Sequence, residues 1–192
     1  RESTERLNDI NDTLIARSEE LYRTVKSKSV MLVPTPLESV CSVAEDRFHK
    51  KYPDAPLTLE EPEGVEVLAD ANYLSEALYN LMTNAWEANV AAGHEQSPVS
   101  VVCYNIRLYT VLEVRDDGTG IDETERRKIF EPFYSSKNTN FNWGMGLYHV
   151  RTIVRSHLGT LQVENRKEGG AAFFILLPRY DGSTRREGGH RK

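Results

Sequence analysis

The chain has 192 residues, which is enough for one domain with a hydrophobic core but too few for two full-size domains. It carries 24 Lys and Arg against 29 Asp and Glu, which gives a net charge of −5. Because general nucleic-acid binding depends on cationic contacts to phosphates, this acidic charge excludes that class of function. The longest apolar run, Ala171 to Leu177, is far shorter than the roughly 20 residues that cross a bilayer. Two cysteines, Cys41 and Cys103, lack metal-ligand spacing, so we expect buried, reduced thiols in a cytoplasmic protein.

The N-terminal segment predicts an amphipathic helix. Glu2 to Ser29 is charged and contains no Gly or Pro. Its apolar residues recur at spacings of three, four and seven, which places them on one stripe that needs a partner surface: Leu7, Ile10, Leu14, Leu21 and Val25. Pro34 and Pro36 then predict a break in the chain, after which helical periodicity resumes from Leu37 to His49.

The rest of the chain mixes helices with strands. Helices are expected at Asp70 to Ala92, which is the strongest, and at Gly144 to His157. Strands are expected at Leu57 to Leu59, as a hairpin within Val99 to Arg115, and as a closing pair at Thr160 to Asn165 and Ala171 to Leu177. Asp116 to Phe141 is expected to be a loop with at most a short helix. This order predicts an α/β fold, a two-layer sandwich with helices on one face of a mixed, mostly antiparallel sheet.

The strongest helix carries a polar stripe. At about 100° per residue, Glu76, Asn80, Asn84 and Glu87 lie on one side of it. The stripe could simply be the solvated face of the helix. However, asparagine is a mediocre helix former, and its amide oxygen is a hard ligand that suits Mg²⁺ beside a nucleotide. From the helix alone, both interpretations stay open.

Two glycine-containing segments predict a local anion site in this acidic chain. Asp116 to Ile121, with the sequence DDGTGI, follows a predicted strand and is either an ordinary Asp-Gly turn or a close approach to a ligand. Gly144 to Leu147 opens a helix, whose first N–H groups and dipole attract anions. Between them, Lys137 ends an aromatic segment and could reach a phosphate.

In this order and spacing, the segments resemble the nucleotide-binding domain of sensor histidine kinases, within the GHKL superfamily that also includes gyrase, MutL and the ninety-kilodalton heat-shock chaperone. LSEALYNLMTNAWEA resembles the asparagine box, DDGTGI the first glycine box, IFEPFYSSK the phenylalanine box and GMGLYHVRTIVRSHLG the second glycine box, while GGAAFFILLP looks like the last strand. The likeness covers Leu37 to Pro178. It implies the Bergerat fold, with ATP and Mg²⁺ between the long helix and a lid from Phe133 to Trp143.

The resemblance also implies roles for individual residues. Asn84 matches the Mg²⁺ ligand, Asn80 its neighbour near the phosphates, and Asp116 the carboxylate that accepts from the adenine amino group. The implied catalytic set is Glu76, Asn80 and Lys137. The implied nucleotide-binding set is Asn80, Asn84, Asp116, Gly118, Gly120, Ile121, Phe133, Lys137, Gly144, Met145, Gly146 and Leu147. Hydrolytic superfamily members carry a glutamate where this chain has Asn80, and an amide cannot take a proton from water, so phosphoryl transfer is favoured over hydrolysis.

The chain departs from the family pattern in three places. Glu87 stands where many histidine kinases have a basic residue, so Lys137 is expected to supply the positive charge near the phosphates. Asn142 and Trp143 replace the glycine that usually opens the second glycine box. The lid before Gly144 is short.

A histidine kinase also needs an acceptor histidine on a dimerisation helix. His94 is followed by Glu95, but it lies in a polar loop without helical context, and the other histidines fit packing, surface or tail positions. Residues 1–33 resemble the second helix of a dimerisation hairpin and residues 34–180 the catalytic domain. Residues 181–192 are rich in Gly, Ser and Arg and are expected to form a disordered tail. The chain is therefore expected to be a fragment whose acceptor helix lies upstream of Arg1, from a parent that can be membrane-anchored.

The partners expected from this resemblance are ATP, the phosphoacceptor helix of the same kinase and the receiver domain of a response regulator, with a homodimer in the full-length protein and no nucleic acid. Two alternatives stay open. One is a degenerate nucleotide-binding domain that scaffolds a partner through the Leu7, Leu14 and Leu21 stripe. The other is a self-contained GHKL ATPase.

Overall fold

The computed structural model describes residues 30–134 and 145–182. In chain order the elements are β1 (Val33–Pro36), α2 (Leu37–Lys51), β2 (Leu57–Glu60), β3 (Glu66–Ala69), α3 (Ala71–Ala91), β4 (Val99–Asn105), β5 (Tyr109–Arg115), the short 3₁₀ helix η1 (Lys128–Phe130), α4 (Gly146–Ser156), β6 (Thr160–Asn165) and β7 (Ala171–Pro178). The helix expected at residues 2–29 and nearly all of the tail expected at 181–192 lie outside the described residues. No helix within the described ranges is long and apolar enough to cross a membrane.

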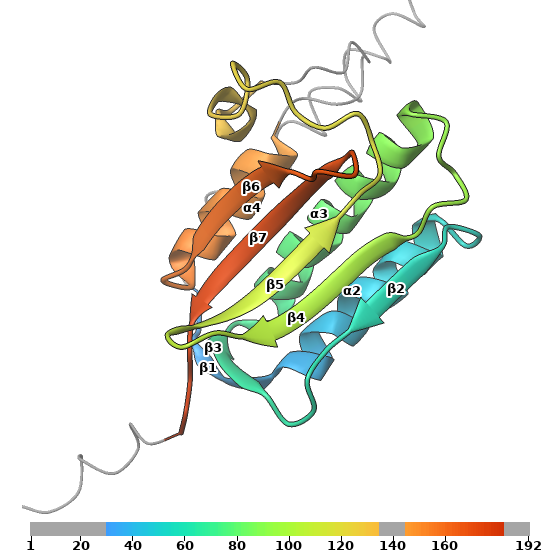
Figure 1. The fold of residues 1–192 in the computed structure, drawn as a ribbon. Helices are drawn as coiled ribbons and strands as arrows, with labels where there is room; N and C mark the ends of the chain where they lie inside the picture. Colours follow the sequence, from blue (N-terminus) through green and yellow to red (C-terminus); the bar gives the residue numbers. More distant parts are fainter. Residues whose placement is uncertain (1–29, 135–144, 183–192) are drawn as a thin grey trace, which may run out of the picture.

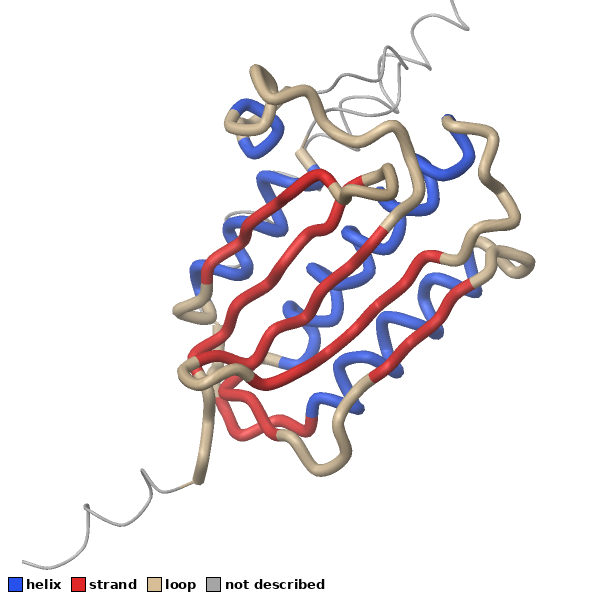
Figure 2. Tube along the Cα trace, in the orientation of Figure 1, coloured by secondary structure: helices blue, strands red, loops and turns tan. Residues whose placement is uncertain are grey.

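Five strands form the main sheet in the order β2-β4-β5-β7-β6. β2 pairs with β4 in parallel, and the other neighbours are antiparallel. Helices α2, α3 and α4 all lie on the same face of this sheet (Figures 1 and 2). The predicted two-layer α/β sandwich on a mixed, mostly antiparallel sheet is therefore confirmed.

The core lies between the sheet and the three helices. Because side chains alternate along a strand, every second residue of the central strands faces the helices, as Val101, Leu112 and Ile175 do in neighbouring strands. The apolar stripe of α3 meets them, and Leu74 and Leu78 have no exposed surface. Burying each such side chain stabilises the fold by about 1.5–3 kcal/mol.

Asp70 fixes the start of α3. Its carboxylate accepts hydrogen bonds from the N–H groups of Asn72 at 3.2 Å and Tyr73 at 3.4 Å, which caps the helix. The N–H of Asp70 donates to Nε2 of His157 at 3.0 Å, and Nδ1 of His157 donates to the carbonyl of Ile153 at 2.8 Å. The buried imidazole thus ties the beginning of α3 to the end of α4.

The expectation that Pro34 and Pro36 only interrupt the chain is wrong. They belong to β1, which pairs antiparallel with β3, and neither strand is apparent from the sequence pattern. A two-stranded sheet consists of edge strands, where a residue without an N–H is tolerated if that side faces away from the partner. Between the prolines, the buried Thr35 hydroxyl donates to the carbonyl of Ala69 at 2.9 Å.

Candidate functional site

Four segments that are distant in sequence meet at one end of the sheet. The C-terminal end of α3, the loop after β5, the turn between β6 and β7, and the start of α4 all lie at the top of Figure 1. The antiparallel order β5-β7-β6 brings the end of β5 beside the β6–β7 turn. The C-terminal end of α3 and the first glycine segment therefore lie at the same end of the molecule as the start of α4.

The polar stripe of α3 is half-buried. Within the described part of the chain, the amide side chains of Asn80 and Asn84 make no hydrogen bond, so their oxygens can serve a ligand. One turn earlier, Oε1 of Glu76 lies 3.5 Å from Nε2 of His149 on α4. His149 is 5% exposed, and this contact links the stripe to the helix that the second glycine segment opens.

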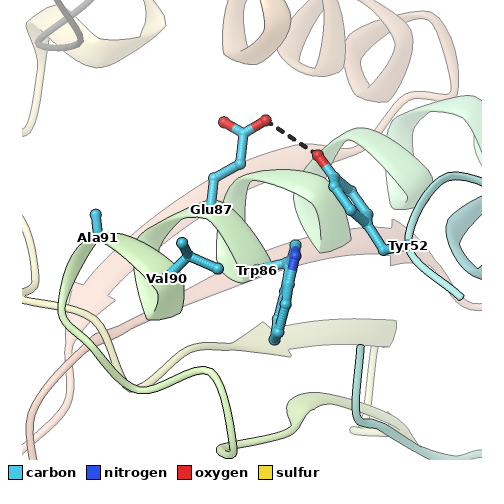
Figure 3. A pocket seen from close by; sticks show the side chains of 5 residues that line it. All are labelled: Tyr52, Trp86, Glu87, Val90 and Ala91. Atoms are coloured by element: carbon cyan, nitrogen blue, oxygen red, sulfur yellow. Dashed lines mark hydrogen bonds between the residues drawn. The ribbon is translucent and has the colours of Figure 1, made fainter. Parts of the chain in front are cut away.

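Glu87 is directed toward α2. It accepts a hydrogen bond from the Tyr52 hydroxyl at 3.3 Å, beside a shallow groove of about 340 Å³ that these two residues line together with Trp86, Val90 and Ala91 (Figure 3). The Tyr52 and Trp86 rings pack with centroids 6.2 Å apart. Glu87, which departs from the histidine kinase pattern, is thus held by Tyr52, the residue that follows the last residue of α2.

Asp116 is the most deeply buried carboxylate of the predicted site, with 3% of its surface exposed. Its Oδ1 accepts hydrogen bonds from the N–H groups of Gly118 at 2.9 Å and Ala171 at 3.1 Å. Burial raises the pKa of the Asp116 carboxyl above its ordinary value, while these two N–H donors oppose part of the rise. Its Oδ2 makes no hydrogen bond to any described residue and is left for a donor from a ligand.

The two glycines of the first glycine segment serve different needs. A Cβ at Gly118 would lie 2.8 Å from the Ala88 Cβ and 2.9 Å from Oδ1 of Asp116, so only glycine lets the loop pass this close to α3. Gly120 has φ +78°, a left-handed conformation that glycine adopts without strain. The close approach at Gly118 is therefore to the protein's own helix.

Three residues that the sequence analysis did not single out hold this loop. Oδ1 of Asn89 accepts from the N–H of Asp117 at 2.7 Å. The side chain of Asn165 bonds both the N–H and the carbonyl of Ile121, and Arg166 donates to the carbonyl of Asp116. The sequence carries a signal only for Asn89, which is an asparagine on the apolar side of the predicted helix. The structure shows that it has no exposed surface.

The other predicted site residues are spread more widely. Met145 is buried and precedes α4, Gly146 begins that helix at a position where a Cβ would meet nothing within 4 Å, and Leu147 and Ile121 pack against the core. Phe133 lies in the loop after η1, 63% exposed and at φ +66°. Lys137 and Gly144 lie outside the described residues. The structure thus brings Gly118 against α3, Asp116 and Gly120 against the β6–β7 turn, and Glu76 to α4, whereas it shows no such contact for Phe133.

The sequence pattern of the family described as "Histidine kinase-, DNA gyrase B-, and HSP90-like ATPase" matches residues 69–181, more than half of the chain. The chain belongs to this family. Its described residues form an ATP-binding domain of the kind that sensor histidine kinases carry, as the predicted resemblance implied.

The similar curated proteins are named as sensor proteins or as kinases. The signal transduction histidine-protein kinase/phosphatase MprB of Mycobacterium avium (strain 104) is 36% identical over 120 residues, which cover 59% of this chain and 22% of that protein. Sporulation kinase C of Bacillus subtilis (strain 168) is 29% identical over 62% of this chain and 26% of its own length. The C4-dicarboxylate transport sensor protein DctB of Rhizobium meliloti (strain 1021) is 29% identical over 88% of this chain and 27% of its own. The chain thus spans about a quarter of the length of these relatives.

Solved structures of histidine kinases are also similar to this chain. The mycobacterial sensor histidine kinase MprB matches with a TM-score of 0.65 and 26% identity, over 77% of this chain and 97% of the solved one. The catalytic domain of histidine kinase ThkA matches with a TM-score of 0.66 and 25% identity, over 77% of this chain and 95% of the solved one. The similarity therefore extends over nearly the whole of each solved domain.

Proposed function

We propose that this chain is the catalytic part of a sensor histidine kinase, which transfers the γ-phosphoryl group of ATP to a histidine on a dimerisation helix. The observation that carries the proposal is the arrangement of Asp116. Backbone N–H groups hold one of its oxygens in a buried site, and the other oxygen is unbonded within the described residues. The loop that carries this carboxylate contacts the C-terminal end of α3, one turn beyond Asn84.

The base end of the site would select adenine. An ionised carboxylate only accepts hydrogen bonds, so the free oxygen of Asp116 suits the exocyclic amino group of adenine. Gly118 and Gly120 would form the turn beneath the base, with Ile121 beside it. Guanine presents a carbonyl oxygen at the corresponding position, which an anionic acceptor disfavours.

The metal would be Mg²⁺, held by Asn84 with Asn80 beside it. Among residues 30–134 and 145–182, no group of three or more His, Cys, Asp or Glu could hold a metal. Mg²⁺ in nucleotide sites needs only one or two protein oxygens besides phosphates and water, and the unbonded amide oxygen of Asn84 fits that requirement. When bound, the ion would neutralise charge on the phosphate oxygens.

The phosphate end would use the start of α4 and Lys137. The first N–H groups of an α-helix have no partner within the helix and attract anions, and even a Cβ at Gly146 would meet nothing within 4 Å. Glu76 on α3 lies 3.5 Å from His149 of α4, and Asn80 lies one turn further along the same stripe. Because the amide of Asn80 cannot accept a proton from water, these residues support transfer to a protein acceptor over hydrolysis.

The partners of such a kinase would be the phosphoacceptor helix, a second copy of the kinase and the receiver domain of a response regulator. We propose that the second helix of the dimerisation hairpin lies within residues 1–33, before β1, and that residues 34–180 form the catalytic domain. The names of the relatives support this setting, since they describe sensor proteins and histidine-protein kinases.

Calorimetry with ADP and Mg²⁺ tests the site. The unaltered chain should bind, and Asn84→Ala should weaken binding at least about tenfold in the presence of Mg²⁺. Asn72→Ala is the matched control, because Asn72 is an exposed asparagine at the start of the same helix and should leave the affinity unchanged. Absence of binding by the unaltered chain, or equal affinity of the two variants, refutes the site.

Transfer is tested by adding a histidine-containing helix hairpin of a related kinase together with labelled ATP. Label should appear on the hairpin, with little phosphate released into solution. Steady phosphate release by this chain alone, abolished by Glu76→Gln, would instead identify an ATPase.

A further inference from the structure

The loop of residues 116–121 contains no helix or strand, yet side chains from two directions hold its backbone. Asn89 holds it from α3, and Asn165 and Arg166 hold it from the end of β6. No part of the proposed ATP chemistry assigns a role to these three residues. They act on the backbone that carries Asp116.

Asn165 binds the loop in the way that a neighbouring strand would. Its Oδ1 accepts from the N–H of Ile121 at 2.8 Å, and its Nδ2 donates to the carbonyl of the same residue at 2.7 Å. Gly120 lies so close that a Cβ there would be 3.0 Å from Oδ1 of Asn165. One side chain thus fixes both the position and the direction of the peptide that ends the loop.

Arg166 holds the other end of the loop. Its Nη1 donates to the carbonyl of Asp116 and to Oδ1 of Asp117, both at 2.6 Å. Because the carbonyl and the side chain of Asp116 share one backbone, fixing the carbonyl limits how far the carboxylate can turn. The guanidinium also helps to lower the pKa of Asp116, against the effect of burial.

Neither residue contributes to the hydrophobic core. Asn165 is exposed, and about a quarter of the Arg166 side chain is accessible. Their hydrogen bonds reach across 44 and 50 residues of sequence to a single loop. Hydrogen bonds near the surface contribute little net stability, whereas a displaced acceptor in a binding site loses its ligand contact outright.

We propose that Asn165 and Arg166 are positioning residues for recognition of the nucleotide base, and that they set the preference for an adenine base by holding Asp116 in place. This inference rests on the proposed ATP site. It predicts that removing either side chain reduces discrimination between bases while the fold remains intact.

The test compares ADP with inosine diphosphate, which carries a carbonyl oxygen in place of the adenine amino group. Affinities of both, with Mg²⁺, are measured by competition against a fluorescent ADP analogue for the unaltered chain and for Asn165→Ala, Arg166→Gln and Lys167→Ala. Lys167 is the matched control, because it is the next residue, is exposed and makes no hydrogen bond within the described structure. Urea unfolding of each variant is measured in parallel.

We expect Asn165→Ala and Arg166→Gln each to lower the ratio of ADP to inosine diphosphate affinity by about fivefold, the affinity equivalent of one typical hydrogen bond. Asn165→Asp keeps the acceptor but loses the donor, so it should fall between Asn165→Ala and the unaltered chain. The urea midpoint should change little. General destabilisation would weaken both nucleotides equally and leave the ratio unchanged.

An unchanged ratio in both variants overturns the inference, and so does a fall of the same size in Lys167→Ala. If the unaltered chain binds neither nucleotide, the proposed ATP site itself fails. If it binds ADP and the variants discriminate as well as it does, only the positioning role fails.

Discussion

Replacing Gly170 with alanine gives a strong test of how the β6–β7 turn supports Asp116. Gly170 has φ +77°, and a Cβ at this position would lie 2.0 Å from the carbonyl oxygen of Asp116 and 2.9 Å from the Cα of Asp117. A carbon and an oxygen in contact normally lie about 3.3 Å apart, so something must move by more than about 1 Å. The obstacle is backbone, which cannot rotate away as a side chain can.

The expected cost has two parts. A residue with a Cβ in the left-handed region costs about 1–2 kcal/mol, and overpacking against a fixed neighbour adds about 1–3 kcal/mol. Gly169→Ala is the matched control, because Gly169 also has a positive φ, +107°, but a Cβ there would meet nothing within 4 Å. Gly170→Ala should therefore destabilise the fold by about 1–3 kcal/mol more than Gly169→Ala.

Urea unfolding followed by circular dichroism measures this difference, and ADP calorimetry measures its effect on the site. Gly170→Ala should also bind ADP more weakly than Gly169→Ala, since the displaced peptide carries Asp116. If the two variants unfold at the same urea concentration, the close approach of the turn to Asp116 does not constrain the fold, and the reasoning is refuted.

Three further predictions follow from other parts of the structure. Burial raises the pKa of Asp116, and its carboxylate must be ionised to accept a hydrogen bond from adenine, so ADP affinity should begin to fall at a higher pH than it would if an exposed aspartate bound the base. Calorimetry from pH 7 to 4 should show this fall. The Asp116→Asn variant has no carboxylate to titrate and should lack it. The Cys41 and Cys103 thiols lie 3.9 Å apart, and their hydrogen bond and burial both raise the pKa of Cys41. Ellman's reagent at pH 8 should therefore react with both thiols only after the protein unfolds. Rapid reaction of the folded protein would contradict this. Asp70→Ala should cost about 1 kcal/mol of stability through loss of the α3 cap, whereas Asp70→Ser should retain most of it; equal urea midpoints for the two variants would show that the cap contributes nothing.

Periodicity was sufficient to predict the elements with long, regular patterns. Helix α3 begins and ends within one residue of the predicted bounds, because Asp70 is a strong N-cap and the apolar positions repeat over the whole segment. The β4–β5 and β6–β7 pairs were predicted because their strands are rich in β-branched and aromatic residues and are joined by short turns.

The two strands that were not predicted depend on pairing between residues that are far apart in the sequence. β1 and β3 are each four residues long, and β1 contains two prolines, so only the pairing across thirty or more residues reveals the two strands. The residues that hold the 116–121 loop depend in the same way on tertiary contacts. Asn165 gives no local signal, because its role follows from the position of Ile121 in the folded chain.

The hydrogen bonding of the 116–121 loop has a consequence for its dynamics. The N–H groups of Asp116, Asp117, Gly118 and Ile121 donate respectively to the Ala171 carbonyl, Asn89, the Asp116 carboxylate and Asn165. These amide protons should exchange with solvent as slowly as those of a strand, although the segment has no regular secondary structure. A loop that is already ordered loses little conformational entropy when a base binds. Ordering of this loop therefore takes little from the free energy of base binding.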